Sequence, residues 1–486
     1  MLSFEEYAGH DGSGLAGLIA SGDVSAAEVH ATAVAAIRAV DEQLHAVVEG
    51  PWEQPLDHAA DGPFGGVPFV LKDILCHATG VPMHLGSRVA RDGVPYDEDS
   101  LLMQRFKRAG LATVATAKTP ELAMSAWTEP VLGGPVHNPW DVTRSPGGSS
   151  GGPAALVAAG AVPLAHANDG GGSIRIPAAY NGLVGLKPSR GRVPLGPGQQ
   201  ELFFGNAVEF AVARTVRDSA ALFDLVHGNA PGEKYGAPLP SGPYAGEVGV
   251  RRPLRVAVSL EDWGDTPVDP QVRRVVEETA RVLEALGHEV VVARPPIDWE
   301  AMLAAFTTTW CFQLVGSVYG IAELLGKPVD GTSYEATNLT CARAGKELGP
   351  LELLGALDQI NLLSRAFAGF LGDHDVLLSP VANELQPTLG TYDADDADID
   401  AAGWVRRVMS PFPLCMTYNM TGNPAISVPV GQSDEGLPIG VQLGASMYRE
   451  DVLYQLAGQL EERLPWRDRR PAVHVASAAR STAPAV

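Results

Sequence analysis

The chain has 486 residues, 45% of them hydrophobic, so it is long enough to bury a large core in one big domain or in two to three smaller ones. Acidic residues outnumber basic ones by 57 to 35, and the resulting net charge of -22 disfavours a nucleic acid or an anionic membrane as a direct partner. The four cysteines are far apart in the sequence and form no CxxC or His-paired motif, so we expect neither a zinc site nor a disulfide framework.

The N-terminal segment and the hydropathy pattern predict a protein that stays in the cytoplasm. Residues 1–12 carry acidic side chains where a signal peptide carries basic ones, and no apolar run approaches membrane-spanning length. We therefore expect a soluble, unexported chain that makes no membrane contact.

The first half of the chain predicts an α/β layer structure. Residues 12–48 are predicted to form a helix, with Ser25 and Glu28 as a capping box. Residues 64–220 are rich in glycine, proline and small side chains, and short apolar runs at 67–71, 112–115 and 161–165 indicate buried strands separated by helices.

The second half returns to ordinary composition. Residues 254–259 and 289–293 are predicted strands on either side of an amphipathic helix at 270–286, and together they form one βαβ unit. The segment 392–400, with five aspartates, is predicted to be a solvated loop. Residues 471–486 are predicted to be a disordered tail.

A glycine-rich segment, SPGGSSGGPAAL at 145–156, allows three interpretations. A linker is disfavoured because helix-forming residues follow directly, and a phosphate loop is disfavoured because no lysine follows the glycines. The pattern GxSxG around Ser149 fits a nucleophile elbow, although the preceding segment is rich in turn residues where an elbow needs a strand. A plain glycine-rich turn also fits.

A second glycine-rich element and a lysine upstream favour a catalytic interpretation. Gly170, Gly171 and Gly172 come directly before Ser173, and consecutive glycines let backbone N–H groups converge on a developing oxyanion. Lys72 ends an apolar run that we expect to be buried, and a buried lysine is costly unless it is paired or neutral. A tight turn at Ser173 and an ion pair of Lys72 with Asp73 are the non-catalytic alternatives.

These residues together resemble the amidase signature family. The resemblance rests on VPFVLKD ending at Asp73, PGGSSGG at 146–152, DGGGSIRIPA at 169–178 and GLVGLKPSRGRVP at 182–194. The 24-residue separation of Ser149 and Ser173 also matches the family pattern. The resemblance implies one α/β domain over residues 1–470, with a large mixed, twisted sheet covered on both faces by helices. Its catalytic core would comprise 64–220 and 415–445, and its variable substrate-pocket region 225–410.

The resemblance implies a Ser-cisSer-Lys triad. Ser173 is the expected nucleophile, Ser149 the bridging serine in a cis peptide, and Lys72 the base, which must be neutral to accept a proton. The expected product of the first step is an acyl-enzyme, and no metal or cofactor is required.

Further roles follow from the same resemblance. The expected oxyanion donors are the N–H groups of Gly170, Gly171, Gly172 and Ser173. Ser150 is expected to donate supporting hydrogen bonds, and Asp169 and Arg175 resemble the ion pair that braces the nucleophile loop.

The substrate is less well defined by the sequence. NDGGGSIR at 168–175 is similar to the branch that contains the 6-aminohexanoate cyclic dimer hydrolases, which has a cysteine in its pocket. Candidate pocket residues are Met124, Trp127, Trp310 and Cys311, each of which could also belong to the core. The expected substrate is a small linear or cyclic amide, anilide, carbamate or ester.

Two alternatives from other classes stay open. The chain could be the glutaminase subunit of a tRNA-dependent amidotransferase, which shares the triad, or a non-catalytic binding module on this fold. Homodimers are common in the family, so a homodimer is possible.

Overall fold

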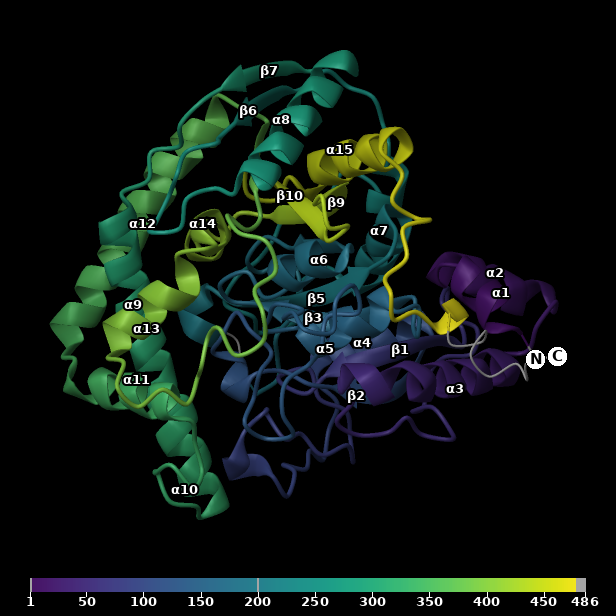
Figure 1. The fold of residues 1–486 in the computed structure, drawn as a ribbon, viewed down its shortest axis with the longest axis horizontal. Coiled ribbons are helices and arrows are strands. Elements are labelled where there is room, and N and C mark those ends of the chain that lie inside the picture. Colours follow the sequence, from purple (N-terminus) through teal and green to yellow (C-terminus); the bar gives the residue numbers. More distant parts are fainter. Residues whose placement is uncertain (1, 199–200, 478–486) are drawn as a thin grey trace.

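A ten-stranded mixed sheet forms the centre of the computed structural model, which describes residues 2–198 and 201–477 (Figure 1). The strands follow the spatial order β2-β1-β3-β5-β4-β9-β10-β8-β6-β7. Strands pair in parallel at the two ends of the sheet, and β3, β5, β4, β9, β10 and β8 pair antiparallel in the middle. The strands are β1 (Val67–Lys72), β2 (Leu111–Ala117), β3 (Leu164–Asp169), β4 (Val184–Lys187), β5 (Val208–Ala213), β6 (Arg255–Val258), β7 (Glu289–Val292), β8 (Val376–Pro380), β9 (Ala425–Gln432) and β10 (Pro438–Ala445).

Fifteen α-helices in the described part of the chain surround this sheet, and the predicted single-domain α/β fold is confirmed. Helices α9, α11, α12 and α13 gather on one side of the molecule, and α1, α2 and α3 lie on the opposite side (Figure 1). The helices are α1 (Phe4–Gly9), α2 (Gly12–Ser21), α3 (Ala26–Leu44), α4 (Leu101–Ala109), α5 (Gly151–Ala158), α6 (Arg175–Asn181), α7 (Val216–Val226), α8 (Pro270–Ala285), α9 (Trp299–Val315), α10 (Ile321–Leu325), α11 (Ala336–Glu347), α12 (Pro350–Gly372), α13 (Ala401–Met409), α14 (Pro413–Thr421) and α15 (Glu450–Arg463).

The predicted N-terminal helix is two helices. Gly22, in the left-handed region at φ 77°, ends α2, and Ser25 begins α3 with the predicted capping box to Glu28. The prediction of one continuous helix over 12–48 is wrong because a glycine C-cap followed by a serine N-cap stops one helix and starts another. The helix α3 also ends earlier than predicted, at Leu44.

Most predicted strands are confirmed, with one shift. The strands β1 and β2 contain the predicted runs, and β6, α8 and β7 form the predicted βαβ unit with parallel strands. The strand predicted at 161–165 instead spans Leu164–Asp169 as β3, since residues 161–163 form the turn that follows Gly160. This shift places two polar residues, Asn168 and Asp169, at the end of a buried central strand.

The acidic segment 392–400 is an irregular and largely exposed loop, as predicted. The predicted tail is partly wrong, because residues 471–477 pack on the domain. Val473 and Val475 are buried, and their N–H groups donate to the carbonyls of Pro139 and Ala159. The rest of the predicted tail, 478–486, lies outside the described residues.

One helical segment is longer and more apolar than predicted. Trp299–Leu325 runs from α9 through a π-helical turn at Gly316–Gly320 (η5) into α10, and by length and composition alone it could cross a membrane. Half of its most apolar window is buried within the domain, where Phe306, Trp310 and Leu314 belong to a second hydrophobic core. This helical packing accounts for the hydropathy of the segment.

Candidate active site

Lys72 is the last residue of β1, a strand buried along its whole length between β2 and β3. Its amine nitrogen Nζ lies 2.6 Å from Ser149 Oγ and 2.6 Å from Asn168 Oδ1. Burial lowers the pKa of Lys72 well below its ordinary value, although the carboxylates of Asp169 and Glu209 raise it. The predicted burial of this lysine is confirmed, and its contacts are with neutral groups.

The loop before α5 holds Ser149 with a cis peptide bond to Gly148, as the resemblance implied. A Cβ at Gly148 would lie 2.9 Å from the backbone of Ala126 and Trp127, so only glycine fits this close approach. The Thr128 hydroxyl donates to Gly147 O at 2.8 Å and accepts from Gly151 N at 3.1 Å. The residues directly before Ser149 form no strand, so the context of a nucleophile elbow is absent.

Ser173 lies in the loop between β3 and α6, where Asp169 organises the backbone. Asp169 accepts from Gly172 N at 2.8 Å and from Ile174 N at 3.2 Å. The Gly172 N–H is therefore already taken up by Asp169, and its predicted role as an oxyanion donor stays a prediction. The N–H groups of Gly170, Gly171 and Ser173 have no hydrogen-bond partner among the described residues, and all three residues line a cavity.

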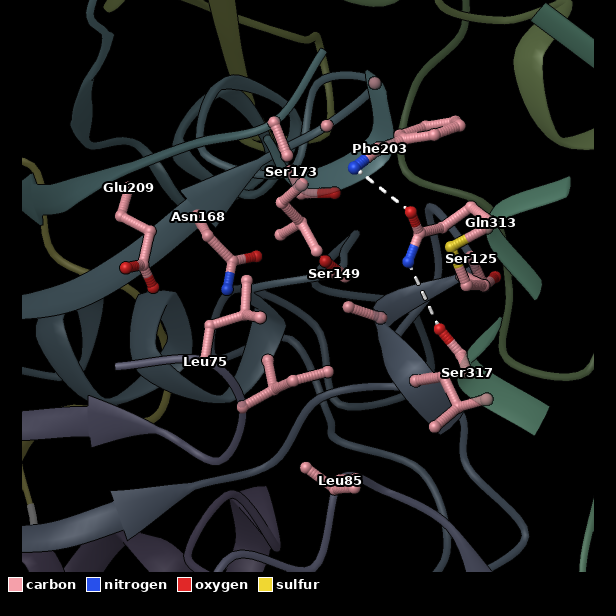
Figure 2. A pocket seen from close by; sticks show the side chains of 18 of the residues that line it. Leu75, Leu85, Ser125, Ser149, Asn168, Ser173, Phe203, Glu209, Gln313 and Ser317 are labelled. Carbon is pink, nitrogen blue, oxygen red and sulfur yellow. Dashed lines mark hydrogen bonds between the residues drawn. The ribbon is translucent and has the colours of Figure 1, made fainter. Parts of the chain in front are cut away.

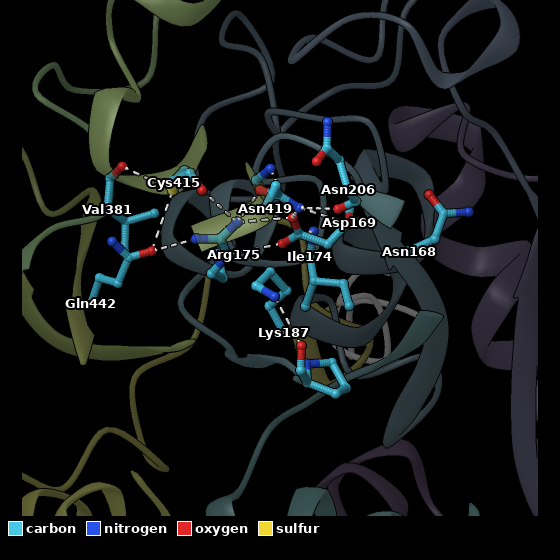
Figure 3. Close-up of polar contacts among 12 residues, drawn as sticks. Asn168, Asp169, Ile174, Arg175, Lys187, Asn206, Val381, Cys415, Asn419 and Gln442 are labelled. Carbon is cyan, nitrogen blue, oxygen red and sulfur yellow. Dashed lines mark hydrogen bonds and ion pairs between the residues drawn. The ribbon is translucent and has the colours of Figure 1, made fainter. Parts of the chain in front are cut away.

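Asp169 and Arg175 form a fully buried, bidentate ion pair (Figure 3). Arg175 Nε and one of its terminal nitrogens, Nη2, each lie 2.9 Å from a carboxylate oxygen of Asp169. Burial raises the pKa of Asp169, but the charge and hydrogen bonds of Arg175 outweigh that effect and lower the pKa to about 2. The predicted pair therefore exists as an ion pair in the core.

Side chains that are distant in sequence accept the remaining hydrogen bonds of the Arg175 guanidinium group. The Oε1 atom of Gln442 in β10 and the Oδ1 atom of Asn419 in α14 each accept from Arg175 at 2.7 Å. Asn419 Nδ2 also donates to Asp169 Oδ1 at 2.8 Å. Ser150, which was expected to support this region, donates to Asn168 O at 3.4 Å.

A cavity of about 370 Å³ opens in front of Ser149 and Ser173 (Figure 2). Met124 and Trp310 line it, as predicted from the sequence. Most other lining side chains are apolar, and many of them come from the segments around 74–96, 122–126 and 202–207 and from α10, whereas α9 and η5 also contribute the polar Gln313 and Ser317. On the α9 side, Gln313 accepts from Phe203 N at 3.1 Å and donates to Ser317 Oγ at 3.3 Å.

Two predicted pocket residues do not reach the cavity. Trp127 is buried in an aromatic cluster, where its ring stacks on Tyr392 with centroids 4.2 Å apart. Cys311 follows Trp310 by one residue, and one residue is about 100° around a helix, so Cys311 faces α11 and belongs to the same hydrophobic core as Cys341. Neither residue lies on the cavity wall, because residue type alone does not fix the direction of a side chain.

Several residues of the site were not predicted from the sequence. Asn168 stands inside the motif NDGGGSIR, and its place beside Lys72 could have been inferred from the adjacency of parallel strands. Gln313, Asn419 and Gln442 carry no local signal, since their partners are distant in sequence. Within the described residues, no three His, Cys, Asp or Glu side chains gather to hold a metal ion.

Comparison with known proteins identifies the family. Residues 28–453 match the family model described as Amidase. The mixed sheet, the buried lysine–serine pair and this match define an amide hydrolase. The chain belongs to the amidase signature family, as its motifs predicted.

The relatives agree with this assignment over nearly the whole chain. The 6-aminohexanoate-cyclic-dimer hydrolase of Paenarthrobacter ureafaciens is 34% identical over 95% of this chain and 96% of its own. A putative amidase, AmiC, of Mycobacterium tuberculosis is 37% identical over 94% of this chain and 95% of its own. A solved structure of 6-aminohexanoate cyclic dimer hydrolase superposes with a TM-score of 0.90 at 33% identity, covering 96% of this chain and 99% of that one.

Proposed function

We propose that the chain is a serine amidohydrolase that cleaves a small, neutral, non-peptide amide through an acyl-enzyme on Ser173. The observation that carries the proposal is the 2.6 Å contact between the buried Lys72 amine and the Ser149 hydroxyl at the wall of the cavity that Ser173 also lines. A serine needs a base to become a nucleophile, and a buried lysine with a lowered pKa can be that base.

The reaction would proceed in two halves. Ser173 Oγ attacks the amide carbonyl and forms a C–O bond, while its proton passes to Ser149 and the Ser149 proton passes to Lys72. The N–H groups of Gly170, Gly171 and Ser173 stabilise the oxyanion. The C–N bond then breaks and the leaving amine takes a proton back through Ser149. Water, deprotonated by the same relay, attacks the acyl-enzyme and releases the acid.

The cavity favours a compact apolar substrate. Its volume suits a ligand of modest size, and its lining offers few charged groups, of which Glu209 lies at the edge near Asn168. The relative's name, 6-aminohexanoate-cyclic-dimer hydrolase, supports cyclic or linear aliphatic amides as the first class to test. Carbamates, anilides and esters share the acylation step, so we include them. A cytoplasmic enzyme without a macromolecular partner remains part of the proposal.

Covalent labelling tests the nucleophile without knowledge of the substrate. The purified chain is incubated with a fluorophosphonate, and intact mass spectrometry with peptide mapping locates the adduct. We expect one adduct on Ser173, its loss in Ser173→Ala, and a rate at least about 100-fold lower in Lys72→Met. Ser317→Ala is the matched control, since this serine lines the same cavity without contacting Lys72, and it should be labelled like the wild type.

Other labelling outcomes point elsewhere. An adduct on Ser149 would restore the nucleophile-elbow interpretation. A folded wild-type chain that takes up no label would contradict the proposal and favour the amidotransferase subunit or the binding module. Hydrolysis of a simple anilide by the chain alone would separate an independent amidase from a subunit that works only in a complex.

A further inference from the structure

Asn168 contacts the Lys72 amine directly, although the proposed reaction gives it no role. It is the second-to-last residue of β3, its side chain is 4% exposed, and it lines the cavity together with Ser149 (Figure 2). Its Oδ1 atom lies 2.6 Å from Lys72 Nζ, the same distance as Ser149 Oγ. Lys72 therefore has two oxygen neighbours, and only one of them can give it a proton.

The types of these two neighbours decide the direction of the hydrogen bonds. A neutral amine has two N–H donors and one lone pair, whereas an ammonium has three donors and no lone pair. An amide oxygen only accepts, so Asn168 Oδ1 must take an N–H of the amine. A hydroxyl can donate, so the lone pair of the neutral amine is left for the Ser149 O–H.

The other end of the Asn168 amide supports a functional reason for this residue. Its Nδ2 group is buried and has no hydrogen-bond partner among the described residues. A buried donor without a partner destabilises the fold, so packing alone does not favour an asparagine here. In the structure the amide turns Oδ1, and not Nδ2, towards the Lys72 amine.

We propose that Asn168 is a positioning residue that holds the Lys72 amine through a neutral acceptor, so that the amine lone pair faces the Ser149 hydroxyl and remains free to take a proton. This inference rests on the proposed function. The charge of the side chain matters as much as its shape, because an aspartate of the same size would place an anion against the amine and keep it protonated. The titratable groups around Lys72 come from three segments: Asp73 and Cys76 from its own, His166 and Asp169 from β3, and Glu209 from β5. The Glu209 Oε1 atom lies 3.2 Å from His166 Nε2.

The pH profile of fluorophosphonate labelling tests this role independently of substrate. For Asn168→Asp we expect the acid limb of the Ser173 labelling rate to move to higher pH by at least about one unit, so that the labelling rate at pH values below the limb falls about tenfold or more and recovers in alkali. Asn206→Asp is the matched control, because Asn206 is buried in the neighbouring loop without contacting Lys72 (Figure 3). The acid limb of Ser173 labelling in Asn206→Asp should lie at the same pH as in the wild type.

A second variant keeps the test decisive if Asn168→Asp folds poorly. Asn168→Ala removes the acceptor without adding charge, and we expect a lower labelling rate at every pH with no upward movement of the acid limb. A wild-type pH profile in Asn168→Asp, or a wild-type rate in Asn168→Ala, would overturn the inference. A wild-type chain that is not labelled on Ser173 at any pH would overturn the proposed function itself.

Discussion

Burial and neighbouring charges shift the pKa values of single residues in this site away from their values in water. Lys72 is buried among neutral acceptors, and its pKa falls. Asp169 is buried against Arg175, and its pKa falls to about 2, so it stays ionised. Burial disfavours charge in both cases, and only the ion pair with Arg175 reverses that effect. The same core thus contains a lysine that favours the neutral form and a carboxylate that stays charged.

The buried ion pair of Asp169 and Arg175 predicts that loss of the arginine lowers the stability of the fold. Arg175→Met leaves Asp169 charged and without its main partner, so we expect the free energy of unfolding at pH 7 to fall by about 3–5 kcal/mol. Arg38→Met is the control, because Arg38 and Glu53 form an exposed pair whose loss should change stability by less than about 1 kcal/mol. Urea unfolding of both variants measures the difference, and equal small losses would show that the pair does not brace the loop.

At the scale of elements, α9 contributes one face to the cavity and another to the contact with α11. On α9, Trp310 faces the cavity while Cys311 faces α11, as the helical turn requires. The two helices approach closely where Gly345 of α11 meets the backbone of Cys311, and a Cβ at Gly345 would lie 2.3 Å from that carbonyl oxygen. The position of the cavity wall therefore depends on a glycine that lines no part of the cavity.

This close approach predicts a difference between two glycines. Gly345→Ala should push α11 away from α9, lower the free energy of unfolding by about 1–3 kcal/mol, and raise KM for a cavity-filling substrate more than it lowers kcat. Gly316 follows the last residue of α9, and a Cβ added there would meet no atom within 4 Å. Gly316→Ala should therefore be neutral or stabilising by up to about 1 kcal/mol. Thermal unfolding and steady-state kinetics check both, and equal behaviour would rule out the proposed packing constraint.

At the scale of the whole molecule, buried carboxylates join segments that are far apart in sequence. Glu121 accepts from Glu335 N at 2.8 Å and from Asn338 Nδ2 at 2.9 Å, and Glu335 accepts from Val131 N at 2.8 Å. Burial, together with the negative charge of Glu121, raises the pKa of Glu335 to about 8. These contacts tie the start of α11 to the segment that lines the cavity at 122–126.

The raised pKa of Glu335 predicts how stability depends on pH. The folded protein keeps a proton that the unfolded chain loses above about pH 4.5, so the contribution of Glu335 is most favourable below that pH and declines as the pH rises to about 8. Glu335→Gln stays neutral, so it should match the wild type near pH 5 and be about 1–3 kcal/mol more stable at pH 8. Urea unfolding at both pH values tests this.

A matched control accompanies the Glu335 measurement. Glu284→Gln, on the exposed face of α8, should show no pH-dependent difference from the wild type. A Glu335→Gln stability difference that is the same at pH 5 and pH 8 would contradict the assignment of the titration to Glu335.

The sequence by itself determined the family, the α/β class and the residues nearest the chemistry. Lys72, Ser149, Ser173, Asp169 and Arg175 stand in short motifs, and glycines allow the tight turns beside the two serines, so these residues can be identified from nearby sequence. The βαβ unit at 254–293 was predictable for the same reason, because hydrophobic periodicity is a local signal.

Only the tertiary structure decided what surrounds those residues. Asn419 and Gln442 reach Arg175 because β9 and β10 return to the middle of the sheet beside β4. Whether Trp310 or Cys311 faces the cavity depends on helix packing between distant segments, whereas the Gly172 N–H is held by Asp169, only three positions away. Side-chain direction and long-range packing are set by the summed contacts of the whole fold, and no local pattern encodes them.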